Sequence, residues 1–369
     1  MGFLLGIIYL SFISLGLPDA LLGAAWPNMY PAFHVPVSYA GAISMIIAFG
    51  TIISSLQSDR LTRRFGTGKV TAVCVGITAL ALWGFSISHS FLMLCLWAVP
   101  YGLGAGSVDA SLNNYVALHY ASKHMSWLHC FWGVGTIVSP FIMSYALANR
   151  TWNSGYRMVG LIQLGIALLL LVTLPVWNVN QSTSREDGKS VGLTGALKIK
   201  GVPFLLLGFF AYCAAEATTM QWASTYFVEV KGIAADRAAG FAALFYIGIT
   251  AGRFISGIIT DRLGDRKMIL LGTGILVCGI FILCLPVKSY TVAFAAFLVI
   301  GLGCAPIYPC IIHSTPYNFG AENSGAIIGI QMASAYVGST FIPPLFGLLG
   351  NAVSFSILPV YLLGFVVLM

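Results

Sequence analysis

Charged side chains are scarce in this chain: of its 369 residues only 8% are Asp, Glu, Lys or Arg, and only 11 are acidic. Hydrophobic residues make up 58%, and the mean hydropathy is +0.90. A soluble fold of this length could not bury so much apolar surface. We therefore expect an integral membrane protein. The net charge of +7 is read as a property of its loops, not as a sign of a nucleic-acid partner.

The chain also lacks the residue patterns of metal, redox and catalytic sites. Its eight cysteines all fall inside apolar runs, and none has C-x-x-C spacing. We expect them to be buried packing residues, without a disulfide framework or a metal site. The sequence shows no nucleophile–base pair and no appended soluble domain. We therefore expect no cofactor and no enzymatic activity, which argues against an intramembrane enzyme or a sensor.

Long apolar runs are what the sequence has in abundance. A helix that crosses a membrane needs about 20 apolar residues, and twelve segments of the chain reach this length. They lie near residues 3–28, 38–58, 69–88, 91–117, 124–148, 155–177, 203–229, 238–260, 267–287, 290–312, 321–347 and 351–369. The predicted fold class is therefore all-α integral membrane, with twelve transmembrane helices.

The distribution of Lys and Arg predicts the orientation, because cytoplasmic loops are enriched in these residues. One set of alternating loops carries twelve Lys or Arg residues, and the other set carries five. The richer set places both termini on the cytoplasmic side of the cell (plasma) membrane. The longest polar stretch, residues 178–201, then reads as a cytoplasmic linker between six-helix bundles at residues 1–177 and 202–369.

A charged segment occurs twice, at an offset of 202 residues. Residues 257–267 read G-I-I-T-D-R-L-G-D-R-K, and residues 55–64 read S-L-Q-S-D-R-L-T-R-R. A polar loop repeated half a chain apart indicates two similar membrane halves. We expect these loops, with one basic residue of the eighth predicted helix, to form a cytoplasmic gate. Its members are Asp59, Arg60, Arg64, Arg253, Asp261, Arg262 and Arg266.

The repeated segments resemble the G-x-x-x-D-R-x-G-x-R-[KR] loop of the major facilitator superfamily. The second copy follows this pattern, whereas the first has Ser55 and Thr62 at the glycine positions, which bears on the tightness of its turn. The resemblance implies the major facilitator fold. It also implies a central cavity lined by helices 1, 4, 7 and 10, and transport by alternating access.

Three carboxylates lie inside predicted membrane helices: Asp19 in the first, Asp109 in the fourth and Glu216 in the seventh. Charge within a bilayer is costly, so each is a candidate functional residue. All three fall on helices that line the cavity in the family named above. Buried structural acceptors are the alternative reading. Glu216 lies 13 residues into its predicted segment, about 20 Å deep at the rise of a helix, and has no basic partner within sequence reach.

His129 lies 5 residues into the fifth predicted helix, at nearly the same level as Asp109 in a helical hairpin. A carboxylate and an imidazole at that depth can pair or pass a proton. We predict that Asp109 carries the coupling proton and that His129 tunes it, with a packing histidine as the alternative reading.

Amides, hydroxyls and aromatic rings accompany the carboxylates. Sugar hydroxyls need donors and acceptors, and the apolar face of a pyranose needs an aromatic ring. Asn113 lies four residues after Asp109, on the same helix face. The predicted substrate-binding residues are Asp19, Trp26, Asn113, Tyr212, Glu216, Thr219, Gln221 and Trp222.

Four motifs resemble the fucose permease branch, which includes sodium-dependent glucose transporters. They are L-P-D-A-L-L-G-A-A-W-P, D-A-S-L-N-N-Y-V, W-L-H-C-F-W-G-V-G and E-A-T-T-M-Q-W. The resemblance implies cation-coupled uptake of a monosaccharide, with acidic coupling or binding residues at Asp19 and Asp109. We expect a proton as the cation, a lipid bilayer as the environment and a monomer as the working unit.

A weaker likeness indicates a second function. Residues 133–140, G-V-G-T-I-V-S-P, resemble the fifth-helix signature of drug/proton antiporters. Ser139 replaces a glycine of that signature, and the glycine pair after the proline is absent. The alternative function is therefore a proton-driven antiporter that exports drugs or other amphipathic small molecules.

Overall fold

The computed structural model describes the whole chain except residues 1, 37–38, 182–190, 234 and 286–288. Within this described part the structure is helical and contains no strand. The first helices are α1 (Gly2–Asp19), α2 (Leu21–Ala32), α3 (Tyr39–Phe65), α4 (Thr67–Ser86), α5 (Phe91–His119), α6 (Ser122–Asn149), α7 (Trp152–Val172) and α8 (Leu174–Gln181). The remaining helices are α9 (Gly192–Lys198), α10 (Val202–Glu229), α11 (Ala235–Leu263), α12 (Asp265–Cys284), α13 (Tyr290–Cys304), α14 (Ile307–Phe319), α15 (Ala321–Ala352), η1 (Phe355–Ile357) and α16 (Leu358–Leu368).

Each of the twelve predicted segments contains a helix, so the predicted fold class is confirmed. Among the described residues, ten helical stretches are long and apolar enough to span a membrane. Two of them consist of two helices each, α1 with α2 and α13 with α14. The other two predicted segments are occupied by α11 and by the shorter stretch Phe355–Leu368.

The chain packs as two compact units. Unit 1 contains residues 1–115, 128–196 and 321–333, and unit 2 contains residues 116–127, 197–320 and 334–369. The start of α15 therefore packs within unit 1, and the connection between α5 and α6 packs within unit 2. The bundles predicted at residues 1–177 and 202–369 remain a prediction.

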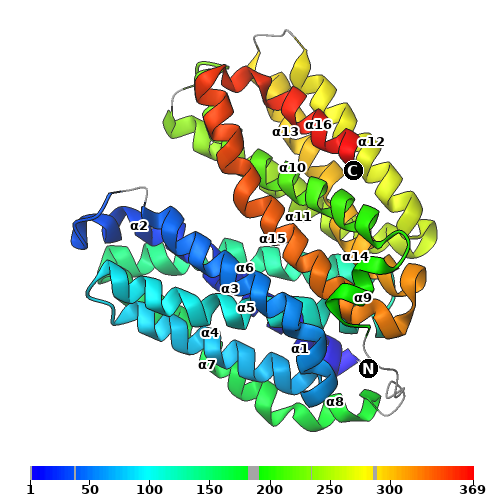
Figure 1. Ribbon diagram of the computed structural model, residues 1–369. Coiled ribbons are helices and arrows are strands. Elements are labelled where there is room, and N and C mark those ends of the chain that lie inside the picture. Colours follow the sequence, from blue (N-terminus) through cyan, green and yellow to red (C-terminus); the bar gives the residue numbers. More distant parts are fainter. Residues whose placement is uncertain (1, 37–38, 182–190, 234, 286–288) are drawn as a thin grey trace. The chain divides into compact units, whose positions relative to one another are not determined.

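Within unit 1, α4 and α7 pair extensively and lie side by side in Figure 1. A cluster of buried apolar side chains joins them to α1, α2 and α5, with Leu21, Trp26 and Phe85 among its members. In unit 2, α13 packs mainly on α11 and α12. Each unit is stabilised internally because its helices bury an apolar face, and about 25 cal/mol is gained per Å² of apolar surface removed from water.

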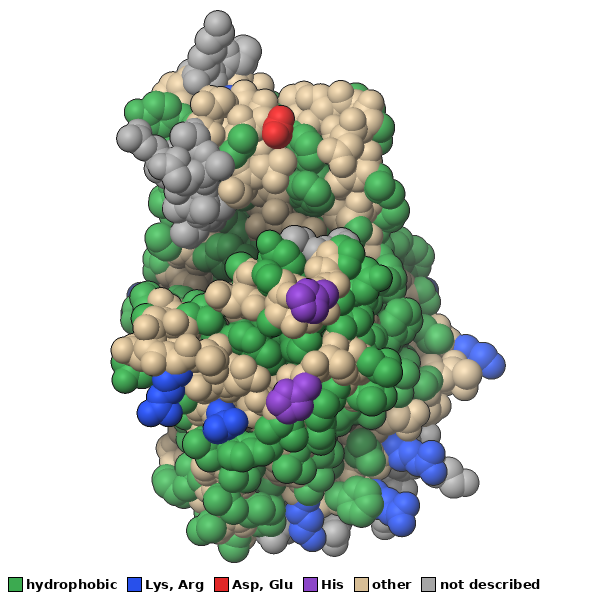
Figure 2. Space-filling model, turned by 90° about the vertical axis from the view of Figure 1, so that its left-hand side faces the viewer, with side chains coloured by type: hydrophobic (Ala, Val, Ile, Leu, Met, Phe, Trp, Pro, Cys, Tyr) green, Lys and Arg blue, Asp and Glu red, His purple; other side chains and the backbone are tan. Residues whose placement is uncertain are grey.

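Hydrophobic side chains also cover much of the face shown in Figure 2, with few charged side chains among them. Phe141, Phe204 and Val367 are more than 70% exposed. Such a surface is stable in lipid and not in water. Cys278 and Cys284 are exposed on this surface, so the prediction that all cysteines are buried is wrong. An apolar run can place a side chain toward lipid as well as toward the protein core.

The two repeated loops end in different turns. In the second copy α11 ends at Leu263, and Gly264 makes the turn with φ of 77°. The matching residue in the first copy, Thr62, continues α3 and bonds its hydroxyl to the Ser58 carbonyl at 2.9 Å. The turn comes four residues later at Gly66, with φ of 84°. The Thr62 substitution therefore lengthens α3 by about one turn, since a side chain at φ near +80° is strained for all residues except glycine.

Candidate functional site

Asp19 stands at the end of α1 and is exposed, with hydrogen bonds to two aromatic side chains of unit 1. Its Oδ1 accepts from the Tyr101 hydroxyl of α5 at 3.0 Å. Its Oδ2 accepts from the Trp132 indole N–H of α6 at 2.9 Å. A carboxylate has about four lone-pair sites, so both oxygens can accept further hydrogen bonds. The site therefore combines an open acceptor with two aromatic rings, and three helices position it.

Pro18 explains why α1 ends where it does. Proline has no N–H, so it cannot donate to the Ser14 carbonyl one turn earlier in the helix. The side-chain amide of Gln163, from α7, donates to that carbonyl instead. The Ser14 hydroxyl in turn donates to Gln163 Oε1 at 2.6 Å. This reciprocal pair satisfies the buried backbone group and anchors the helix end that carries Asp19.

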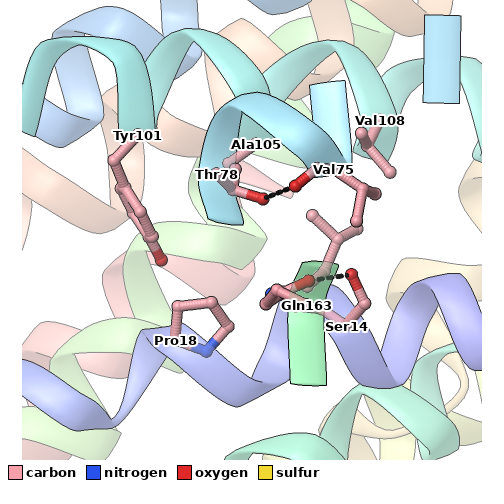
Figure 3. A pocket seen from close by; sticks show the side chains of 9 residues that line it. Ser14, Pro18, Val75, Thr78, Tyr101, Ala105, Val108 and Gln163 are labelled. Carbon is pink, nitrogen blue, oxygen red and sulfur yellow. Dashed lines mark hydrogen bonds between the residues drawn. The ribbon is translucent and has the colours of Figure 1, made fainter. Parts of the chain in front are cut away.

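Figure 3 shows Ser14, Pro18 and Gln163 on one side of a small pocket, with Thr78 and Tyr101 opposite. The pocket lies among α1, α4, α5 and α7 and has room for about one water molecule. It is too small for a sugar. The Tyr101 side chain that lines this pocket also donates to Asp19, so the pocket adjoins the Asp19 site.

A second group in unit 1 links Asp109 to His129 through Asn113. The Asn113 amide donates to Asp109 Oδ1 at 2.8 Å. Asn113 Oδ1 lies 3.1 Å from His129 Nε2. All three side chains are buried, and the Phe12 ring makes a T-shaped contact with the imidazole at a centroid distance of 5.3 Å. An amide that accepts from the imidazole and donates to the carboxylate therefore connects the two predicted proton-coupling residues.

In unit 2, Glu216 of α10 pairs with Arg253 of α11, with Nη2 and Oε1 3.2 Å apart. The side chains are 13% and 6% exposed, respectively. Glu216 therefore has a basic partner on another helix, although it has none within sequence reach. The 37 residues between them hide this contact, because α10 and α11 are neighbouring helices. Arg253 lies beside Glu216, and its membership of the cytoplasmic gate stays a prediction.

Other predicted substrate-binding residues bond to backbone or pack in cores. The Tyr212 hydroxyl donates to the Cys304 carbonyl at 2.8 Å, and the Thr219 hydroxyl to the Ala215 carbonyl at 2.8 Å. The Trp222 indole N–H donates to the Pro343 carbonyl at 2.8 Å. The Tyr212 and Trp222 bonds fix α10 against α13 and α15 within unit 2, whereas the Thr219 bond lies within α10 itself. A role for Tyr212, Thr219 and Trp222 in binding remains a prediction.

Two more predicted binding residues differ in their exposure. Trp26 is 5% exposed and belongs to the apolar cluster of unit 1. Gln221 is exposed on α10. Among the predicted binding residues of unit 1, Asp19 is therefore the exposed one, since Trp26 and Asn113 are both buried.

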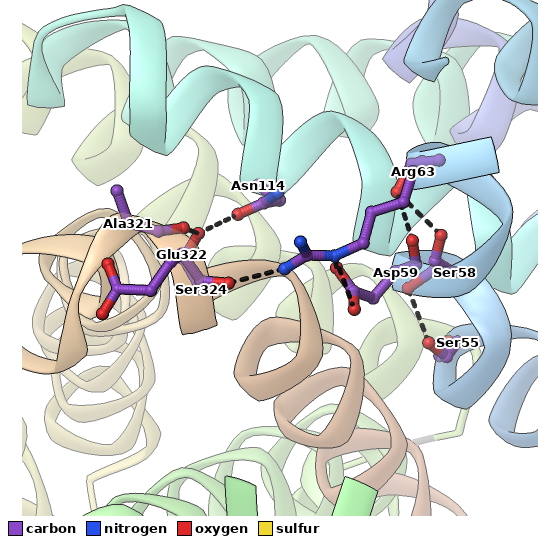
Figure 4. A network of polar contacts seen from close by, with 9 residues as sticks. Ser55, Ser58, Asp59, Arg63, Asn114, Ala321, Glu322 and Ser324 are labelled. Atoms are coloured by element: carbon purple, nitrogen blue, oxygen red, sulfur yellow. Dashed lines mark hydrogen bonds and ion pairs between the residues drawn. The ribbon is translucent and has the colours of Figure 1, made fainter. Parts of the chain in front are cut away.

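Asp59 lies against the first turns of α15, within unit 1. A side chain on Gly325 would place its Cβ 2.3 Å from Asp59 Oδ1, so only glycine allows this approach. Arg63 pairs with Asp59 at 3.0 Å and donates to the Glu322 carbonyl at 2.5 Å. Ser324 adds a bond to Asn114 at 2.7 Å. Figure 4 shows this network extending from α3 to the start of α15. A carboxylate near a helix N-terminus is favourable for the helix dipole.

Asp261 makes the matching contact in unit 2, at the first turn of α6. Its Oδ1 accepts from the Lys123 backbone N–H at 3.3 Å, and its Oδ2 lies 3.0 Å from Lys123 Nζ. The two aspartates of the repeated loops thus each lie near the start of a helix, and their gating role stays a prediction. The four predicted gate arginines of these loops are all exposed: Arg60, Arg64, Arg262 and Arg266.

Four residues at these sites were missed from the sequence: Tyr101, Trp132, Arg63 and Lys123. Trp132 follows His129 by three residues and so shares its helix face, and that spacing could have identified it. Tyr101 lies two turns before Asp109 on a predicted cavity helix. Arg63 is four residues after Asp59, the spacing of a helical ion pair. Only Lys123 had no local signal, because its partner is 138 residues away.

Replacing Glu216 by Gln is expected to lower the thermal unfolding temperature of the purified protein. Removing one member of a buried ion pair costs about 3 kcal/mol or more, because the remaining charge loses its partner. The double variant Glu216→Gln/Arg253→Met is expected to be more stable than Glu216→Gln alone. Thermal unfolding of all three forms in one detergent measures this coupling. Equal losses for the single and double variants would contradict it.

Comparison with known proteins adds to this geometry. Residues 8–343 match the family model of the Major Facilitator Superfamily. Bypass of stop codon protein 6 of Saccharomyces cerevisiae is 23% identical over 285 residues, which is 69% of this chain and 56% of that protein. The chain therefore spans just over half the length of that relative. The glucose/mannose transporter GlcP of Bacillus subtilis is 22% identical over 317 residues, or 82% of this chain and 77% of GlcP.

The crystal structure of FucP in its outward conformation is a close structural neighbour. It superposes with a TM-score of 0.81 over 99% of this chain and 96% of FucP, at 16% identity. A second structure describes FucP as the fucose:proton symporter of E. coli. At this identity the likeness shows the fold, and the family match covers most of the chain. The chain is thus a multi-pass membrane transporter for small molecules and not an enzyme, and it belongs to the major facilitator superfamily.

Proposed function

We propose that this transporter carries a monosaccharide together with a proton, by alternating access. The observation that carries the proposal is the exposed Asp19 carboxylate between Tyr101 and Trp132. A sugar hydroxyl can donate to the free lone pairs of such a carboxylate, and an apolar sugar face can stack on an aromatic ring. A few polar groups among aromatic side chains are typical of a small-molecule site.

The buried group of Asp109, Asn113 and His129 supports the proton part of the proposal. Asn113 bonds to both titratable side chains, so a change of charge on one changes the hydrogen bonds available to the other. Carboxylates and histidines inside membrane helices are typical of proton relays in transporters. We assign proton binding to Asp109, with His129 as the residue that tunes it.

The names of two relatives agree with this class of substrate. GlcP is named as a glucose/mannose transporter, and FucP as a fucose:proton symporter. Other relatives have different names, among them a cis,cis-muconate transport protein and a hexuronate transporter. The assignment to a neutral sugar therefore depends on the Asp19 site, where a carboxylate would repel an anionic substrate.

Uptake into proteoliposomes tests the proposal. With an inward proton gradient we expect labelled glucose, mannose or fucose to accumulate above its external concentration, and to equilibrate only when the gradient is collapsed. Vesicles loaded with an amphipathic dye provide the comparison. Dye extrusion driven by the same gradient, without sugar accumulation, would reject the proposal in favour of export.

We place both termini and residues 178–201 on the cytoplasmic side of the plasma membrane. Single cysteines in a cysteine-free background test this topology with an impermeant thiol reagent added to intact cells. A cysteine at Ser289, before α13, is expected to react, and one at Ser182, which lies outside the described residues, is expected to react only after permeabilisation. Reaction of Ser182→Cys in intact cells would reject the topology.

The two loop aspartates are proposed to stabilise the closed cytoplasmic gate. Neutralising Asp59 or Asp261 removes a charge from the start of α15 or α6, an interaction that stabilises helix ends by about 1 kcal/mol. We expect Asp59→Asn and Asp261→Asn to slow transport about fivefold, with sugar affinity changed less than about twofold. Lys69→Gln, an exposed change on α4, serves as the matched control. A large loss of affinity at unchanged transport rate would exclude the gating role.

A further inference from the structure

Asp265 and His313 form a pair in unit 2 that the proposed sugar and proton sites do not use. Asp265 begins α12, and His313 lies in α14. His313 Nδ1 is 2.7 Å from Asp265 Oδ2, and His313 Nε2 is 3.0 Å from the backbone carbonyl oxygen of Tyr120. The other carboxylate oxygen, Asp265 Oδ1, accepts from the Ser122 hydroxyl. The pair therefore joins α12 and α14 to the connection between α5 and α6.

The partners of the imidazole determine how many protons the pair holds. A backbone carbonyl can only accept, so Nε2 must carry a hydrogen to bond to Tyr120. A neutral imidazole has a single N–H, which would leave a lone pair on Nδ1 facing the carboxylate oxygen at 2.7 Å. That contact is favourable only with a second proton between Nδ1 and Oδ2. The arrangement thus holds one proton more than a neutral histidine beside an ionised aspartate.

The titratable and charged groups around the pair come from α6, α11 and α14. Asp261 at the end of α11 is a second carboxylate, and Lys123 of α6 pairs with it at 3.0 Å. His124 of α6 lies beside the Tyr120 ring, with centroids 5.7 Å apart. The Cys310 thiol of α14 faces Asp265. Asp265 and Asp261 are the carboxylates that act on His313, and a carboxylate beside an imidazole favours a bound proton.

We propose that Asp265 and His313 are a proton-binding site whose proton holds the α5–α6 connection against α12 and α14. In this arrangement the proton supplies the second N–H that lets one imidazole bond to Asp265 and Tyr120 together. Loss of the proton removes one of these bonds and loosens the connection. The contact is therefore favoured at low pH and lost as the pH rises.

As a consequence, the contact of the α5–α6 connection with α12 and α14 depends on pH, and so does the gate to which it belongs. The inference rests on the alternating access of the proposed function, in which the α5–α6 connection must release from α11, α12 and α14. It does not rest on the identity of the sugar or of the coupling ion. Because the site differs from Asp109 and His129, it would act on the conformational equilibrium and leave the coupled proton unchanged.

Hydrogen–deuterium exchange of the full-length protein in lipid nanodiscs, without sugar or gradient, tests the proposal. The readout is a peptide covering residues 116–127, corrected for the intrinsic pH dependence of exchange. Between about pH 6 and about pH 8, the range in which histidine changes charge, we expect its protection to fall about tenfold. His89→Gln, an exposed histidine in the α4–α5 connection, is expected to behave as the wild type.

Two variants give opposite results if the proposal is correct. Gln at position 313 cannot satisfy Asp265 and Tyr120 together, so His313→Gln is expected to lower protection at both pH values. Asn at position 265 can donate to Nδ1 of a neutral imidazole and accept from Ser122, so Asp265→Asn is expected to keep protection at both. Either variant removes the pH dependence.

A wild-type peptide with equal protection at both pH values would overturn the proposal, as would either folded variant that retains the wild-type pH dependence. If His313→Gln does not fold, as judged by thermal unfolding, the Asp265→Asn result decides alone. The readout contains no substrate, so failure of sugar uptake in proteoliposomes leaves this test intact. Equally, failure of this test leaves the sugar-uptake result unaffected.

Discussion

Replacing Asp19 by Asn is expected to reduce sugar affinity by roughly 10- to 100-fold, since a hydrogen bond to a charged group contributes about 1.5–3 kcal/mol. Asn offers one acceptor oxygen where the carboxylate has two. Its amide N–H groups would face either the Tyr101 hydroxyl or the Trp132 indole N–H, which both donate to Asp19. The variant therefore loses acceptors for the sugar and also disturbs the two aromatic side chains. Equilibrium binding of sugar to purified protein measures the change.

The matched controls are Tyr101→Phe and Trp132→Phe, which keep an aromatic ring and remove one donor each. We expect each to reduce affinity by less than about tenfold, because the charged acceptor stays in place. Wild-type affinity in Asp19→Asn, together with a large loss in either control, would mean that the rings and not the carboxylate bind the ligand. The sugar assignment would then lose its main support.

The membrane helices could be predicted from the sequence because their signal is local. A span needs about 20 apolar residues in a row, and this requirement leaves a visible mark at each of the twelve segments. The duplicated loops were visible for a similar reason: matched residues recur at a fixed offset. The sequence also showed that Thr62 replaces a glycine of the loop pattern, and in the structure the turn lies at Gly66 instead.

Contacts between helices distant in the sequence could not be predicted in this way. Arg253 was grouped with the gate because it precedes Asp261 by two turns, yet it pairs with Glu216. Gln163 satisfies the carbonyl freed by Pro18 although it lies 149 residues from Ser14. The spacing of apolar and polar residues along one helix does not show which other helix it faces. Each of these pairs depends on which helices pack together, and that is decided by tertiary packing.

The predicted roles of polar side chains were limited by the same lack of tertiary information. The sugar site was predicted in part from aromatic and hydroxyl groups near Glu216. In the structure, Tyr212, Thr219 and Trp222 donate to backbone carbonyls. Around Asp19 the sequence offered only Trp26, which is buried in an apolar cluster. The aromatic partners of Asp19 come from α5 and α6 instead. The spacing of residues within a helix can show which of them share a face, but not what lies opposite that face.

Asp109→Asn is expected to abolish proton-driven accumulation of sugar while leaving exchange of preloaded sugar intact. Asn is close to Asp in shape, but it cannot bind and release a proton in the physiological range. Its Oδ1 can still accept from the Asn113 amide, as Asp109 does at 2.8 Å, so the local packing is retained. A transporter of this kind would still alternate with sugar bound, but the pH gradient would no longer drive it.

His129→Gln provides the comparison, because Gln can still donate to Asn113 Oδ1 but carries no titratable ring. We expect this variant to accumulate sugar with a shifted pH optimum and a rate reduced about 100-fold, the lower end of the contribution of a positioned proton-transfer partner. Counterflow and gradient-driven uptake, measured on the same proteoliposomes, separate the two variants. Wild-type accumulation by Asp109→Asn with a normal pH dependence would show that the coupling proton binds elsewhere. Asp19 would then be the next carboxylate to test, since its side chain is exposed at the end of α1.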